Sequence, residues 1–95
     1  MGGMTITLQI GNSDDKLTQE RWAQFVECCQ DAVQRFCKAV HFFAASEGSK
    51  RWQNAVWVVE IDCAGAFMLQ KAIIKIRSDY NQDSAAWTIG HTLFI

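Results

Sequence analysis

The chain of 95 residues contains no proline and no long apolar run. Without proline it cannot contain proline-rich linkers or proline-rich ligand segments. Its apolar stretches fall well short of the roughly 18 residues that read as a membrane span, and its first residues lack the charged and apolar regions of a secretory signal. We therefore expect a cytoplasmic protein with no membrane partner, folded as a single domain over residues 4–95, and we interpret 1–3 as a tag remnant or an alternative start.

An excess of charge of either sign is also missing. Nine basic and ten acidic residues give a net charge of −1, and the nearest approach to a basic cluster is Lys50-Arg51. Nucleic-acid affinity depends on phosphate neutralisation by Lys and Arg, so we expect no nucleic-acid partner. The 49% of hydrophobic residues is ordinary for a globular protein and too high for intrinsic disorder.

Residues that carry metal or catalytic chemistry are few and poorly spaced for it. The four cysteines show no C-x-x-C spacing, and the two histidines, His41 and His91, form no pair of the zinc-binding kind. Cys29 and Cys37 fall on the apolar stripe of a predicted helix, where a free thiol packs as a small hydrophobe. The polar segment 12–15 lacks the calcium-loop spacing and is interpreted as a turn. We expect no metal, no cofactor and no recognisable catalytic set.

Along the sequence, the spacing of apolar residues changes in a definite order between that of strands and that of helices. Alternation predicts strands, and apolar residues at three- and four-residue steps predict helices. Thr18 and Asp62 are placed to cap the two helices. The predicted elements are strands at 5–10, 40–45, 55–61 and 85–95, the last with a bulge or break at Gly90, and helices that end near Cys37 and Tyr80.

This order predicts an α+β domain of the ferredoxin-like βαββαβ topology. In that topology a four-stranded antiparallel sheet carries both helices on one face. An alternative treats Gly90-His91 as a hairpin turn, which would add a short fifth strand at the C-terminal end.

The sheet face opposite the helices is expected to be too apolar for exposure. Alternation turns Ile6, Leu8 and Ile10 toward the helices, but the middle strands are apolar on both sides, so their orientation stays open. The open face would carry either Phe43, Val56 and Val58 or Phe42, Trp57 and Val59. Such a patch predicts a homodimer that associates through the sheet. The alternative is that residues 92–95 fold over the face within one chain.

These features favour a small, non-enzymatic protein-interaction or regulatory module that presents the open face or the loop around Trp52. In that loop an indole is flanked by Lys50 and Arg51, and tryptophan and arginine are enriched where interfaces carry their energy. RNA binding through the sheet would need aromatic side chains on the first strand, which has none. The expected interaction residues are Phe43, Trp52, Val56, Trp57, Val58 and Trp87.

The alternative function is a small enzyme or ligand-binding protein of the dimeric α+β-barrel kind. Its pocket would be lined by Trp22, Phe36, Trp57 and Trp87, with His41 as the polar group. Asp83 and Ser84, which lie between the second helix and the last strand, are further candidates for a polar site. The structural interpretation of Asp83, as a helix stop that bonds its own turn, is favoured over a binding role.

Overall fold

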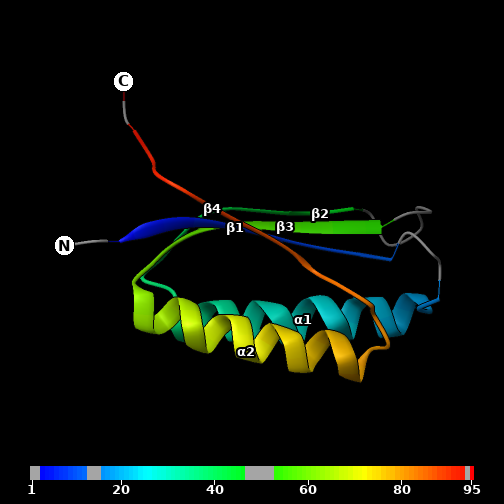
Figure 1. Cartoon of the computed structure of the whole chain (residues 1–95). Helices are drawn as coiled ribbons and strands as arrows, with labels where there is room; N and C mark the ends of the chain where they lie inside the picture. The colour runs from blue at the N-terminus through cyan, green and yellow to red at the C-terminus, as the bar shows by residue number, and fades with distance from the viewer. Residues whose placement is uncertain (1–2, 13–15, 47–52, 94) are drawn as a thin grey trace.

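The computed structural model describes residues 3–12, 16–46, 53–93 and 95. A four-stranded antiparallel sheet, in the order β2-β3-β1-β4, carries both helices on one face (Figure 1). This confirms the predicted ferredoxin-like βαββαβ fold. The elements are β1 (Met4–Asn12), α1 (Gln19–Phe36), β2 (Ala39–Ala45), β3 (Gln53–Ile61), α2 (Cys63–Asp79) and β4 (Ala86–Gly90).

The last strand is shorter than predicted. Its final pair joins Gly90 to Thr5, and only Met4 of β1 lies beyond that pair. A continuation of β4 would therefore have almost no neighbouring strand to bond. No fifth strand forms in the described part of the C-terminal segment, so that alternative is not realised.

Both helices begin where their capping residues predict. The Thr18 side chain accepts a hydrogen bond from the Arg21 amide, and Asp62 Oδ1 accepts one from the Gly65 amide at 2.7 Å. The first turn of α2 lies close against the end of α1, because a Cβ at Gly65 would come within 2.7 Å of the Phe36 carbonyl oxygen. Glycine at position 65 thus allows the two helices to pack.

The core lies between the helices and the inner face of β1 and β3. Alternate residues of β1 point into it as predicted, and the β3 residues that join them include Trp57 and Val59. From α1 the buried side chains are Trp22, Phe25, Cys29, Ala32 and Val33, and from α2 they are Leu69 and Ile73. β3 is therefore oriented with Val56 and Val58 facing outward, which the sequence alone did not decide.

A β-bulge at His41 reverses the alternation along β2. Val40 pairs with Val59 and Phe42 with Val58, so one extra residue lies between these two pairs. Phe43 is consequently turned to the helix side, where its ring stacks on that of Trp57 with 5.0 Å between centroids. This corrects the expected placement of Phe43 on the same face as Val56 and Val58. The prediction of Trp57 as an interaction residue is also corrected, because Trp57 is 0% exposed and belongs to the core.

One buried amide joins three elements at the far end of the sheet. Asn12 Nδ2 donates to the Leu17 carbonyl and to Gln53 Oε1, both at 3.1 Å, and Asn12 Oδ1 accepts from the Leu17 amide at 3.0 Å. Gln53 in turn donates to Gln19 Oε1 at 2.9 Å. The end of β1, the start of β3 and the first turn of α1 are therefore held by one hydrogen-bonded cluster.

The variant Asn12→Ala should lower the free energy of unfolding by about 2–4 kcal/mol. The reason is that the Leu17 amide and the Gln53 side chain lose partners in a buried position. Urea denaturation followed by tryptophan fluorescence measures this loss. The matched control Gln34→Ala, at an exposed amide side chain on α1, should change stability by less than about 0.5 kcal/mol. Equal losses for the two variants would contradict this role of Asn12.

Candidate functional site

The face of the sheet opposite the helices is divided between apolar and polar side chains. Its β2–β3 half carries an apolar cluster in which Phe42 is 55% exposed. Its β1–β4 half carries Thr5, Thr7, Gln9 and Thr88. We call the apolar half, formed by Phe42, Ala44, Val56 and Val58, the open-face patch. Only the β2–β3 half of this face is therefore too apolar to suit exposure to water.

His41 belongs to the same face. Its Nε2 lies 3.9 Å from Glu60 Oε2, and that oxygen also accepts a hydrogen bond from Thr5 Oγ1 at 3.1 Å. The Thr5 hydroxyl is hydrogen-bonded in addition to that of Thr92. The structure therefore groups His41 with Glu60 and Thr5, and not with the two other predicted polar residues, Asp83 and Ser84.

Beyond β4 the chain leaves the sheet on the side opposite the helices and runs away from the domain (Figure 1). Leu93 is 82% exposed, and Ile95 is also exposed. These two side chains therefore do not cover the open-face patch, which corrects, for the described residues, the alternative in which residues 92–95 fold over the face within one chain; residue 94 lies outside the described residues. The short pairing between β1 and β4 explains this, because no neighbouring strand holds the chain to the sheet after Gly90.

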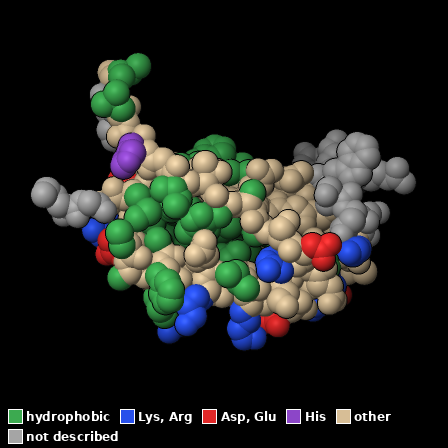
Figure 2. All heavy atoms as spheres, in the orientation of Figure 1, with side chains coloured by type: hydrophobic (Ala, Val, Ile, Leu, Met, Phe, Trp, Pro, Cys, Tyr) green, Lys and Arg blue, Asp and Glu red, His purple; other side chains and the backbone are tan. Residues whose placement is uncertain are grey.

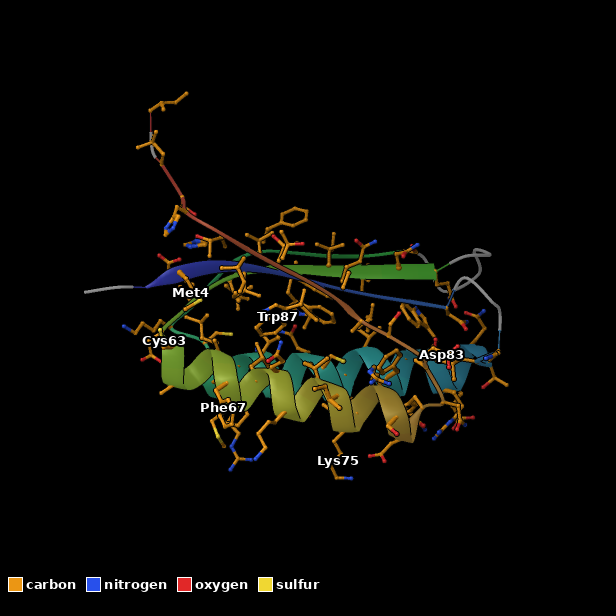
Figure 3. All side chains as sticks on the ribbon, in the orientation of Figure 1. Met4, Cys63, Phe67, Lys75, Asp83 and Trp87 are labelled. Carbon is orange, nitrogen blue, oxygen red and sulfur yellow. The ribbon has the colours of Figure 1, made fainter. Side chains whose placement is uncertain are left out.

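A second apolar surface lies at the β4 edge. Figure 2 shows hydrophobic side chains gathered where β4 passes α2, and Figure 3 places Trp87 between the two elements. Phe67, Ile74 and Ile89 are among the exposed hydrophobic residues of β4 and α2. A groove of about 210 Å³ runs there, lined in part by Leu8, Ile73, Ile74, Arg77 and Trp87. Trp87 thus contributes to this groove and not to the open-face patch.

The predicted aromatic pocket does not form. Trp22 and Trp57 are packed in the core, and the Trp57 indole donates to Gln30 Oε1. Trp87 lies at the opposite edge of the sheet from β2, while His41 is grouped with Glu60 on the other face. None of Trp22, Phe36, Trp57 and His41 lines this groove or the polar cavity at the end of the sheet where β1 finishes. Trp52 lies outside the described residues, so its predicted contact role stays a prediction.

A polar cavity of about 400 Å³ opens at the end of the sheet where β1 finishes and β4 begins. It brings together Asp83 and Ser84, the two residues expected from the sequence, with two side chains that the sequence did not indicate, Gln9 and Asn54. Alternation along a single strand gives no sign of this grouping, because the four residues come from three separate segments. The full lining described is Gln9, Ile10, Gly11, Asn54, Gln82, Asp83, Ser84 and Ala86.

The cysteines have structural surroundings. Burial, with a smaller effect of Cys28, raises the pKa of Cys29 to about 12, and burial raises that of Cys37 to about 11. All four thiols are free. Among the described residues, no group of three or more His, Cys, Asp or Glu side chains could hold a metal ion. The interpretation of Cys29 as a small hydrophobe therefore fits its protonated, buried state.

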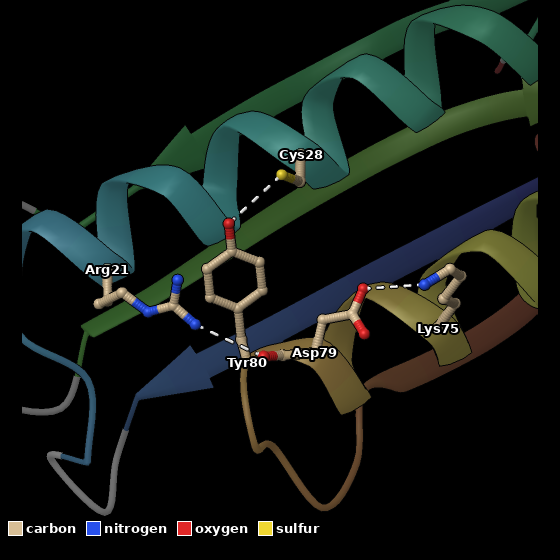
Figure 4. A network of polar contacts seen from close by, with 5 residues as sticks. All are labelled: Arg21, Cys28, Lys75, Asp79 and Tyr80. Atoms are coloured by element: carbon tan, nitrogen blue, oxygen red, sulfur yellow. Dashed lines mark hydrogen bonds and ion pairs between the residues drawn. The ribbon is translucent and has the colours of Figure 1, made fainter.

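Cys28 contributes to the contact between the helices. Its sulfur lies 3.5 Å from the Tyr80 hydroxyl, while the Arg21 guanidinium lies over the Tyr80 ring at 4.3 Å and donates to the Asp79 carbonyl (Figure 4). The hydrogen bond with Cys28 is the main cause that raises the pKa of Tyr80. This network joins α1 to the C-terminal end of α2.

Alkaline conditions should destabilise the fold through Cys29. An unfolded thiol ionises near pH 9.0 and the folded one near 12, so the folded state holds the proton more tightly. The contribution of the protonated Cys29 thiol to the free energy of unfolding is complete below pH 9.0. It is lost as the pH rises toward 12, by up to about 1.4 kcal/mol per pH unit. Urea titrations across this range should show a weaker pH dependence for Cys29→Ala than for the wild type. The exposed-thiol control Cys63→Ala should retain the wild-type dependence, and an unchanged slope for Cys29→Ala would refute the assignment.

Comparisons with known proteins identify the fold and no function. No protein-family model matches the sequence, and no curated protein matches it. The chain is similar to a crystal structure of a dimeric ferredoxin-like protein of unknown function from Thermobifida fusca YX, with 15% sequence identity and a TM-score of 0.64. The alignment covers 97% of this chain and 93% of that one. In the described part of the chain, no helix has the length and apolar character needed to cross a membrane.

Proposed function

We propose that this protein is a non-enzymatic interaction or regulatory module that works as a homodimer, its two copies joined through the open sheet face. The open-face patch is the observation that carries the proposal. It is a contiguous group of apolar side chains on a flat sheet face that the described residues of the same chain leave uncovered. The similar protein from Thermobifida fusca is described as dimeric, which supports the same assembly here.

A second copy of this chain is the partner that best fits a sheet face with one apolar half and one polar half. In a two-fold contact the same patch lies on both sides, so the apolar halves of the two faces can meet each other. Phe42 would serve as the central anchor, since exposed aromatic side chains in the middle of an interface carry much of its energy.

The open-face patch alone has four residues, whereas a standard interface has roughly 20–30 residues on each side. The threonines of β1 and β4 lie on the same face of the sheet and would add to the contact. Such an interface would be apolar at its centre and rich in hydroxyl groups around it. We also propose a cytoplasmic location, because four free thiols suit a reducing compartment.

The variant Phe42→Asp should convert the dimer to a monomer. A carboxylate placed at the centre of the contact would be desolvated opposite its own copy, which costs several kcal/mol. Size-exclusion chromatography with light scattering at tens of micromolar should give the mass of a dimer for the wild type and of a monomer for this variant. The matched control Ile74→Asp, at a half-exposed residue of α2 on the second apolar surface, should remain dimeric.

Two results would overturn this proposal. One is a wild-type protein that is monomeric under these conditions. The other is a dimer that Ile74→Asp dissociates and Phe42→Asp leaves intact, since the contact would then lie on the β4–α2 side. Circular dichroism of each variant shows whether the domain is still folded, and Val58→Asp is a second test of the same patch.

A further inference from the structure

We propose that the polar cavity between the ends of β1 and β4 binds a small ligand that carries a primary ammonium group beside peptide-like hydrogen-bonding groups. The cavity is separate from the open-face patch, because none of the four patch residues lines it. Its volume of about 400 Å³ lies within the range of small-molecule sites.

The cavity exists because β4 begins late. β4 pairs with β1 only from Thr5 to Gln9, so the last residues of β1, Ile10 to Asn12, have no strand on that side. Ile10 and Gly11 line the cavity along this edge. An unpaired strand edge offers main-chain donors and acceptors of the kind that bind extended peptide groups.

The segment before β4 is held in place, which keeps the opposite wall of the cavity in position. Arg77 Nη1 donates to the Gln82 carbonyl at 3.0 Å, and Gln82 Nε2 donates to the Tyr80 carbonyl at 3.3 Å. Asn81 adopts a left-handed backbone conformation with φ of 58°, which ends α2 and turns the chain. Asp83 and Ser84 follow directly after this turn.

The acidic character of the site comes from Asp83. It is the one charged residue among the described lining of the cavity, and its carboxylate forms no hydrogen bond or ion pair with any residue that the structure describes. The two cations of the last turns of α2 are engaged elsewhere: Arg77 with the Gln82 carbonyl, and Lys75 with Asp79 at 3.2 Å. A positively charged ligand would therefore find an unpaired carboxylate.

The remaining polar groups provide further acceptors. Ser84 has a hydroxyl with no partner in the described part of the chain. Gln9 Nε2 donates to Asn54 Oδ1 at 3.3 Å, so the amide oxygen of Gln9 stays available as an acceptor. A Cβ at Gly11 would come within 3.0 Å of Asn54 Oδ1, so glycine keeps this wall open. An ammonium group, with three donors, matches a carboxylate, a hydroxyl and an amide oxygen.

The test uses alanylalanine amide, which has a free ammonium group, and its N-acetylated form, which does not. Two-dimensional NMR of the labelled full chain should show saturable shifts of the Gly11, Asp83 and Ser84 amide signals with the free amine at millimolar concentrations. The acetylated form should bind at least about tenfold more weakly, since a hydrogen bond to a charged group is lost. Putrescine, which has ammonium groups and no peptide groups, should bind more weakly than alanylalanine amide in a separate titration. Equal binding would overturn the part of the proposal that assigns peptide-like groups to the ligand.

Variants assign the binding to the cavity. Asp83→Asn should weaken binding of the free amine at least about tenfold, while the matched control Asp31→Asn, at an exposed carboxylate of α1, should leave it unchanged. Phe42→Asp should also leave it unchanged, which separates this site from the proposed dimer contact. Equal binding of the acetylated form, an Asp83→Asn variant with wild-type affinity, or no saturable shift with either amine would overturn the proposal.

Discussion

The packing of β1 and β3 against the two helices is the constraint on which the rest of the structure depends. Trp57 of β3 and Phe25 of α1 are among the largest fully buried side chains of this interface. Because the helices cover only one face of the sheet, the side chains on the other face, Val56 and Val58 among them, have no helix packed over them. The open-face patch is thus a consequence of having two helices for a sheet with two apolar faces in its β2–β3 half.

Much of the fold could be predicted because its signals are local. Thr18 and Asp62 mark the helix starts through their own side-chain hydrogen bonds, and the alternation of Ile6, Leu8 and Ile10 determines which side of β1 is buried. The orientation of β3 could not be predicted, since valines lie on one side of the strand and Trp57 and Val59 on the other. The bulge at His41 is equally hidden, because no glycine or other irregular residue marks it.

The candidate site was accessible to sequence reasoning only in part. Asp83 and Ser84 could be noticed as polar residues between a helix and a strand, but their neighbours Gln9 and Asn54 come from β1 and β3. Their grouping follows from where β4 begins, which depends on strand pairing and not on local composition. Asn12 is a related case: its buried hydrogen bonds to Leu17 and Gln53 look, in the sequence, like an ordinary turn.

The bulge in β2 links the pairing of one strand to the chemistry of the outer surface. With the extra residue present, Phe42 is turned outward and Phe43 inward against Trp57. If the same residues paired without the bulge, His41 would lie opposite Val58 and Phe42 opposite Trp57. That pairing would exchange these roles and carry the ring of Phe43 to the exterior in place of that of Phe42. A relative of this protein with an unbulged β2 of the same length would therefore present a differently shaped outer face, even if every side chain of the strand were the same.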